Sequence, residues 1–144
     1  MLIGLSPCLD GDVLKILSDM GHGDEVLIAD ANFPAERCAQ RLVRNMGCDS
    51  VQMLSAVLTV FPLDHLVPPV WLMALAEGDS GMGEPSIWVE YRQALALHGY
   101  YRGFNWHKYE AFYQAANNCF AVIQTGETAL YGNIILRKGA IKPS

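Results

Sequence analysis

The chain predicts one α/β domain spanning residues 1–144, with helices and short strands alternating around a largely parallel sheet. Short apolar runs such as 26–29 and 70–76 are bounded by turn residues and are typical of buried strands. The segments between them are longer and carry apolar residues at helical spacing. Such alternation favours a layered βα-type fold. No repeat and no linker divides the chain.

The first half predicts three helices and one strand. Asp10 is a typical N-cap residue for the first helix, and Gly21 is a typical residue just beyond its end. Residues 26–29 form the expected strand. Pro34 fits the first turn of a second helix that ends at Gly47. Ser50 is expected to cap the third helix, whose inner face carries Val51, Leu54, Val57, Leu58 and Phe61.

The second half continues the alternation. Residues 77–84 contain three glycines and three acids, which predicts an exposed and mobile loop. An aromatic linker at 100–106 is expected to separate two helices. The expected elements are a strand at 70–76, helices at 85–99 and 106–117, and strands at 120–124 and 133–137.

Composition excludes several classes of function. Apolar residues make up 51% of the chain and charged residues 17%, which is rich enough to suggest that some apolar residues cover subunit interfaces. The net charge of −5 and the lack of a basic stripe argue against a nucleic-acid partner. No apolar segment approaches the roughly 18 residues of a membrane span, and no secretory signal is visible. We therefore expect no membrane association and a cytoplasmic location.

The cysteines and histidines indicate no metal or cofactor site. No cysteine pair has Cys-x-x-Cys spacing, and the histidines lack the spacing of metal ligands. We expect four reduced, mostly buried thiols, with a catalytic thiol as the lesser alternative. No glycine-rich nucleotide-binding motif occurs. The cysteines are Cys8, Cys38, Cys48 and Cys119.

Two residues around the first predicted strand are the strongest candidates for chemistry. His22 lies between two glycines, which leave the imidazole open to a ligand, and imidazoles titrate near neutral pH. The alternative is a helix-terminal histidine that only interacts with the helix dipole. Asp30 follows the strand at 26–29, where α/β proteins bind ligands. Its alternative role is to cap the next helix or form an Asx turn.

A second pair of candidates precedes the last predicted strand. Tyr131 and Asn133 flank Gly132 and offer a phenol and an amide, and the amide both donates and accepts hydrogen bonds. The alternative is a tight turn with Gly132 at its tip. Tyr113, within a predicted helix, is by itself a typical core aromatic residue.

Three motifs together resemble the ribose pyranase and fucose mutarotase family, and most closely its L-fucose mutarotase branch. They are Gly-His-Gly-Asp at 21–24, Asp-Ala-Asn-Phe-Pro at 30–34 and Tyr-Gly-Asn at 131–133. The resemblance covers nearly the whole chain. It implies an α/β/α domain that assembles into a ring-shaped homo-oligomer, commonly a decamer. It also implies a cofactor-free isomerase that interconverts the α and β anomers of L-fucose or a related monosaccharide.

The resemblance also implies roles for individual residues. His22 corresponds to the family's proton donor, and Asp64 to a carboxylate implicated in the reaction chiefly in animal members. Tyr113 corresponds to a tyrosine near the anomeric centre, and we expect either Tyr113 or a water held by a carboxylate to carry the second proton of the reaction. The residues that correspond to sugar ligands are Asp30, Tyr131 and Asn133.

The chain departs from the family pattern at Tyr109, where many bacterial members carry arginine or histidine. Either the Tyr109 phenol replaces that donor in substrate binding, or His107 reaches the sugar from another direction. Of the tryptophans, Trp106 is the better candidate for stacking on a sugar, because Trp71 lies in a predicted strand.

Three alternative functions remain at this point: a pyranose–furanose isomerase of the ribose branch, a non-catalytic sugar-binding oligomer, and a purely structural subunit.

The distance between His22 and Asp30 decides whether one chain can form the whole site. A strand rises about 3.3 Å per residue, so the two residues could lie roughly 25 Å apart, too far for one monosaccharide. Either the loops fold back, or the site combines residues from two subunits.

Overall fold

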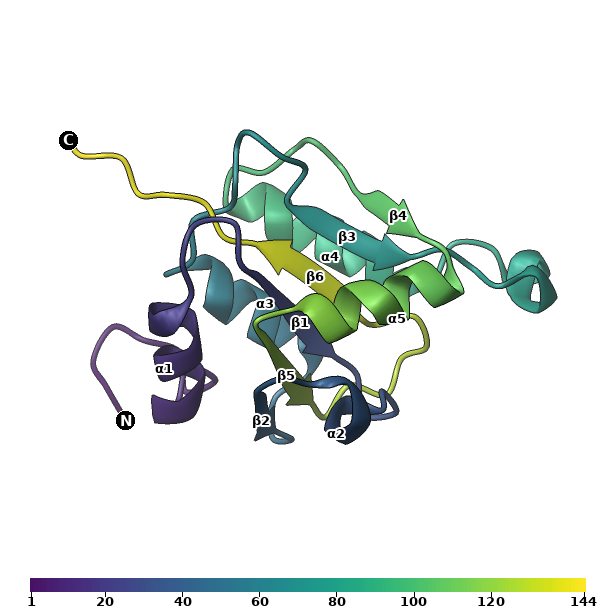
Figure 1. Ribbon diagram of the computed structural model, residues 1–144, viewed down its shortest axis with the longest axis horizontal. Coiled ribbons are helices and arrows are strands. Elements are labelled where there is room, and N and C mark those ends of the chain that lie inside the picture. The colour runs from purple at the N-terminus through teal and green to yellow at the C-terminus, as the bar shows by residue number, and fades with distance from the viewer.

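Six short strands pair into one sheet in the computed structural model, which describes residues 1–144 (Figure 1). The strand order is β2-β5-β1-β6-β3-β4. Five strands run in the same direction, and β6 alone is antiparallel to both of its neighbours, so the sheet is mixed but largely parallel. The strands are β1 (Glu25–Ala29), β2 (Leu42–Asn45), β3 (Val70–Met73), β4 (Asn105–His107), β5 (Ala121–Thr125) and β6 (Ile134–Arg137).

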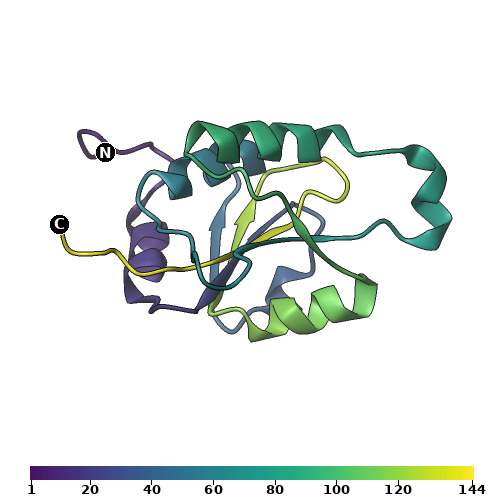
Figure 2. The same ribbon diagram turned by 90° about the horizontal axis from the view of Figure 1, so that it is seen from above.

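The helices cover both faces of the sheet and confirm the layered arrangement (Figure 2). Side chains alternate along β1, so Val26 and Ile28 pack with α1, α3 and α4, whereas Leu27 and Ala29 pack with α2 and α5. None of the helices is long and apolar enough to cross a bilayer. The helices are α1 (Gly11–Asp19), α2 (Ala35–Cys38), α3 (Ser50–Leu58), the 3₁₀ helix η1 (Glu77–Met82), α4 (Ser86–Leu97) and α5 (Tyr109–Asn118).

Local sequence patterns predicted most of the helix ends correctly. The Asp10 side chain accepts the N–H of Val13 at 2.9 Å and caps α1, as expected. Helix α3 begins at Ser50 itself, so the predicted cap is displaced by one residue: the N-cap is Asp49, which forms a capping box with Gln52. The predicted loop at 77–84 contains η1, which is fully exposed and extends away from the body of the molecule in both views.

The predicted helix at 34–47 is wrong over most of its length. Helix α2 ends at Cys38, and residues 42–45 form edge strand β2, which pairs with β5. Val43 lies opposite Ile123, so pairing with an already buried strand outweighs the helical spacing of the apolar residues. The end of the predicted aromatic linker and the start of the helix predicted at 106–117 likewise form β4, which pairs with β3, so α5 begins only at Tyr109.

The prediction of four reduced thiols is also wrong. Cys8 and Cys48 form a disulfide with a Cα–Cα distance of 6.2 Å. They lie 40 residues apart in the chain, and the fold brings them together by placing the N-terminal segment beside the loop after β2. Cys38 and Cys119 are free and buried, and burial raises the pKa of the Cys119 thiol. Neither free cysteine is an accessible nucleophile.

Candidate active site

A cavity of about 220 Å³ opens at the carboxyl end of β1. That volume is below the roughly 300–1,000 Å³ of sites for drug-sized ligands, so the cavity suits only a small ligand. Its lining includes two carboxylates and no lysine, arginine or histidine. The lining residues are Asp30, Asn32, Phe33, Met73, Asp79, Tyr113, Leu130, Tyr131 and Asn133.

Asp30 and Asn133 form one hydrogen-bonded unit at the base of this cavity. The Asp30 N–H donates to Asn133 Oδ1 at 2.8 Å, and Asn133 Nδ2 donates to Asp30 Oδ2 at 3.1 Å. The N–H of Asn32 donates to Asp30 Oδ1 at 3.0 Å. Burial raises the pKa of Asp30, and these hydrogen bonds offset part of the effect. The carboxylate is therefore fixed in orientation and keeps lone pairs for a ligand.

Two buried polar residues that the sequence did not single out as ligands hold the loops around this unit. Gln124 Nε2 donates to the carbonyls of Asp30 and Phe33 at 3.3 and 3.0 Å. Glu127 accepts hydrogen bonds from Ser50, Thr128 and Ala129. Burial raises the Glu127 pKa, but these bonds lower it more, so it stays below its usual range. Only the strand register and the loop packing reveal these roles.

Tyr131 lies at the rim of the cavity in an unusual backbone conformation. Its φ of 60° is in the left-handed region, whereas Gly132 has no positive φ. The predicted turn therefore places its strain on the tyrosine rather than on the glycine. The indole Nε1 of Trp88 donates to the Tyr131 carbonyl at 3.0 Å and helps to hold this conformation.

Tyr113 contributes the second phenol of the cavity, from α5. Its ring stacks on Phe33 with a centroid distance of 5.5 Å and an angle of 8°. Burial, and next the neighbouring Tyr109, raises the pKa of the Tyr113 phenol, so it stays protonated at neutral pH. Tyr109 is exposed and does not line the cavity; its ring packs at 4.9 Å from that of Tyr113.

Two aromatic candidates lie elsewhere. Trp106 packs against Trp88 with a centroid distance of 4.7 Å and does not line the cavity. The idea that it stacks on a ligand therefore fails for this cavity, and the Phe33–Tyr113 pair supplies the aromatic wall. His107 stacks on Trp71 at 4.3 Å and also lies outside the lining, so it does not replace the missing basic residue.

His22 and Asp64 do come together, but at a different place. His22 Nε2 lies 3.6 Å from Asp64 Oδ1, and Arg137 Nε donates to Asp64 Oδ2 at 2.8 Å. The N–H of Leu66, and then Arg137 and His22, lower the Asp64 pKa to about 2. Gly23 has a φ of 90°, a backbone conformation that favours glycine, and a Cβ there would also lie 3.0 Å from the Arg137 guanidinium. A buried carboxylate thus orients a half-exposed imidazole.

The His22 cluster and the cavity lie at opposite ends of the same two strands. Glu25 pairs with Arg137 at one end of β1 and β6, and Ile28 pairs with Ile134 toward the other. The cluster is at the end where the C-terminal tail leaves β6, and the cavity is at the end nearer η1 (Figure 1). The five residues of β1 alone separate them by roughly 15 Å. The loops therefore do not fold back to bring His22 to Asp30.

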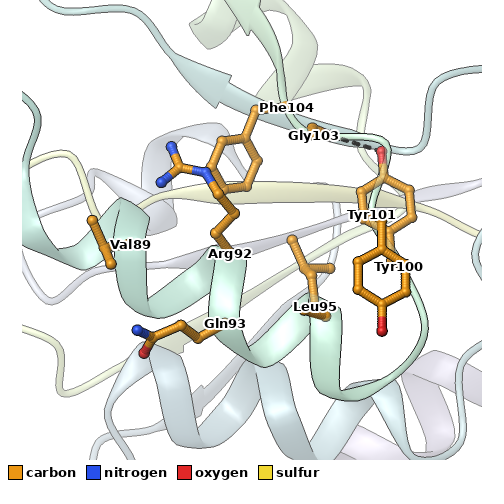
Figure 3. A pocket seen from close by; sticks show the side chains of 9 residues that line it. Val89, Arg92, Gln93, Leu95, Tyr100, Tyr101, Gly103 and Phe104 are labelled. Atoms are coloured by element: carbon orange, nitrogen blue, oxygen red, sulfur yellow. Dashed lines mark hydrogen bonds between the residues drawn. The ribbon is translucent and has the colours of Figure 1, made fainter.

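A larger cavity of about 390 Å³ lies between α4 and the segment 100–104 that follows it (Figure 3). It is lined mainly by apolar and aromatic side chains, among them Leu95, Tyr101 and Phe104. The phenol of Tyr100 donates to the Gly103 carbonyl at 2.8 Å and offers no donor to a ligand. None of the candidate residues lies there, so the smaller, more polar cavity is the better candidate for catalysis.

The fold and the polar cavity define a small α/β protein with a compact polar site at the end of its sheet. The chain belongs to the RbsD / FucU transport protein family, whose model matches residues 3–141.

Solved structures place the chain more closely within the family. A fucose mutarotase from Streptococcus pneumoniae, crystallised in complex with L-fucose, is 38% identical over 98% of this chain and 100% of its own, with a TM-score of 0.92. FucU from Bifidobacterium longum is also 38% identical, over 96% of this chain and 99% of its own, with a TM-score of 0.90. RbsD from Bacillus subtilis, complexed with D-ribose, is 20% identical over 99% of this chain and 100% of its own; its TM-score of 0.74 indicates the shared fold.

Proposed function

We propose that this protein is an L-fucose mutarotase, an isomerase that interconverts the α and β anomers of L-fucose without a cofactor. The observation that carries the proposal is the cavity built on Asp30 and Asn133, in a chain 38% identical over 98% of its length to a fucose mutarotase crystallised with L-fucose. The cavity matches a small ligand with several hydroxyl groups, because it offers fixed carboxylate, amide and phenol groups.

The charge of the cavity supports a neutral sugar over an acidic one. Asp30 and Asp79 line it, and no basic side chain does. A sugar phosphate or a uronate would bring a further negative charge between two carboxylates, which is unfavourable at short range. The substrate class is therefore a free, uncharged monosaccharide.

The complete site combines two subunits in this proposal. Since His22 and Asp30 of one chain lie at opposite ends of β1, one sugar ring cannot touch both. A head-to-tail contact that brings His22 of a neighbouring subunit to the Asp30 cavity solves this problem, and repeated contacts of that kind close into a ring. The assembly is a ring-shaped homo-oligomer, with a decamer as the expected size.

The chemistry follows from the groups assembled. Ring opening removes the proton of the anomeric hydroxyl, breaks the bond between the anomeric carbon and the ring oxygen, and protonates that oxygen. His22 gives the proton to the ring oxygen and takes it back when the ring closes on the other carbonyl face. Asp30, made more basic by burial, takes the anomeric proton directly or through one water. Tyr113 stays protonated and donates a hydrogen bond to the sugar.

His22→Ala should lower the enzyme-dependent rate of anomer exchange by about 100-fold or more, the usual range for loss of a general acid. The measurement is exchange NMR of the anomeric protons of L-fucose, in dilute and weakly catalytic buffer, with and without the protein. The fold should survive, because the His22 side chain is 49% exposed.

The matched control is His65→Ala, which removes an exposed imidazole that lies outside the sugar cavity. Equal rates for His22→Ala and wild type would refute the proposed role of His22.

An enhanced exchange rate confined to D-ribose would indicate the pyranase reaction instead. Binding without enhancement for any sugar would indicate a non-catalytic sugar-binding oligomer, and binding of fucose 1-phosphate as tight as that of L-fucose would refute the neutral substrate class.

A further inference from the structure

The phenol of Tyr131 is held between two groups from the start of η1. Its hydroxyl donates to Asp79 Oδ2 at 2.6 Å and accepts the N–H of Ala76 at 3.0 Å. The N–H of Asp79 donates in turn to the Ala76 carbonyl at 2.9 Å, which closes the first turn of η1 around the phenol. A residue 52 positions away thus determines how Tyr131 is presented to the cavity.

This arrangement decides what Tyr131 can offer a sugar. A phenol has one proton, and here that proton is used by Asp79. The N–H of Ala76 uses one of the oxygen's acceptor positions, which leaves the other free. Tyr131 therefore meets a ligand as an acceptor of a sugar hydroxyl, and the Asp79 carboxylate lines the same cavity.

The contact is also the attachment point of η1. Residues 76–84 are all exposed, and η1 extends away from the body of the molecule in Figures 1 and 2. Among residues 77–82, Asp79 makes the only side-chain hydrogen bond to the rest of the protein. Without it, little besides the chain connections would hold η1 at the rim of the cavity.

We propose that Asp79 is a positioning residue that fixes the Tyr131 phenol as a hydrogen-bond acceptor for the sugar and holds η1 at the rim of the cavity. This inference rests on the proposed function and adds to it a residue that sets how the substrate is recognised. Asp79 acts through Tyr131, so the two residues should behave as one unit.

The kinetic test compares Asp79→Ala, Tyr131→Phe and the double variant by exchange NMR with L-fucose. Asp79→Ala should raise KM by about 10-fold or more, as for loss of a hydrogen bond to a charged group, and change kcat less. In the Tyr131→Phe background the same change should have little further effect. Glu77→Ala removes another carboxylate of η1, one that lies outside the cavity, and should leave KM unchanged. An unchanged KM for Asp79→Ala, or an equal effect in both backgrounds, would overturn the proposal.

Hydrogen exchange at the amide of Ala76 tests the same contact without any sugar. This exposed N–H has the Tyr131 phenol as its partner, so it should exchange slowly in the wild type and in Glu77→Ala. Both Asp79→Ala and Tyr131→Phe should accelerate its exchange. Protection that survives in Asp79→Ala would show that Asp79 does not hold the phenol. A wild type with no mutarotase activity would refute the proposed function, and the exchange result would then still decide the role of Asp79.

Discussion

At the scale of single residues, His22 and Asp64 show why the proposed proton donor needs a partner. Half of the His22 side chain is exposed, so its ring would be free to turn without a fixed neighbour. Asp64 supplies that neighbour, and it is itself held by Arg137 and by the N–H of Leu66. The sequence resemblance grouped Asp64 with the reacting residues. Its burial and its contact with His22 instead favour a role through His22.

A pH-dependent stability difference is expected for Asp64→Asn. The Asp64 pKa is about 2 in the folded protein, below the 3.8 of an aspartate free of such contacts, so the folded state favours the ionised form. The ionised carboxylate therefore contributes its full stability at pH values above the pKa of Asp64 in the unfolded chain. This contribution is lost as the pH falls toward the lower pKa of Asp64 in the folded protein. Wild type should unfold at a higher urea concentration than the variant at neutral pH, and the gap should narrow from about pH 4 down to about pH 2.

Urea unfolding followed by circular dichroism at several pH values measures this gap. Glu90→Gln, a change of an exposed acid on α4, provides the control and should show no such gap. A difference between wild type and Asp64→Asn that stays constant down to pH 2 would contradict the assignment.

At the scale of elements, the loop before β6 depends on contacts with three other parts of the chain. Glu127 accepts from the first residue of α3, while its carbonyl accepts the N–H of Ala31 at 2.8 Å. Gly126 packs so closely that a Cβ there would lie 2.3 Å from the Met46 carbonyl oxygen. The loop that carries Tyr131 and Asn133 is thus held by the ends of β1, β2 and α3 together.

Glu127→Gln should lower the free energy of unfolding by about 1–3 kcal/mol, because an amide nitrogen would face N–H and O–H donors in a buried position. The change should also weaken L-fucose binding, since the loop positions Asn133. Thermal or urea unfolding gives the first quantity, and titration calorimetry the second. For comparison, the exposed Glu90→Gln should change stability by less than about 0.5 kcal/mol. Equal stability for the two variants would count against the structural role of Glu127.

At the scale of the whole molecule, the sheet separates the two parts of the proposed site. Strands β1 and β6 run between them, with the imidazole at one end and the sugar cavity at the other. A monomer of this fold could hold a sugar but could not bring His22 to it. Oligomerisation is then part of the proposed mechanism rather than only a source of stability.

Mixed oligomers of His22→Ala and Asp30→Asn subunits should regain activity that neither variant has alone. In a randomly mixed ring, about a quarter of the sites would combine an intact His22 with an intact Asp30. Co-expression followed by exchange NMR measures the recovery, and light scattering during size-exclusion chromatography gives the subunit number. Mixing His22→Ala with the double variant His22→Ala/Asp30→Asn should recover nothing. A monomeric elution volume, or no recovery in the first mixture, would refute a shared site.

Much of the fold could be predicted from local patterns, because caps, turn residues and apolar runs act over a few positions. Asp10 and Gly21 define the ends of α1, and the run at 26–29 becomes the central strand β1. The helix predicted at 34–47 failed because an edge strand is decided by the neighbour it pairs with, which lies 80 residues away at β5. The motif around Asp30 and Asn133 was visible in the sequence, but their mutual hydrogen bonds were not.

The amino-acid sequence by itself determined the α/β class and the residue types available for sugar chemistry, since both depend on short-range spacing. Only the tertiary structure decided which of those residues meet. Pairing of β1 with antiparallel β6 brings Asp30 and Asn133 together and leaves His22 at the other end of these strands. The packing of η1 beside the loop before β6 brings Asp79 within hydrogen-bond distance of the Tyr131 phenol. Contacts between distant segments depend on how the whole chain packs, and no local pattern encodes them.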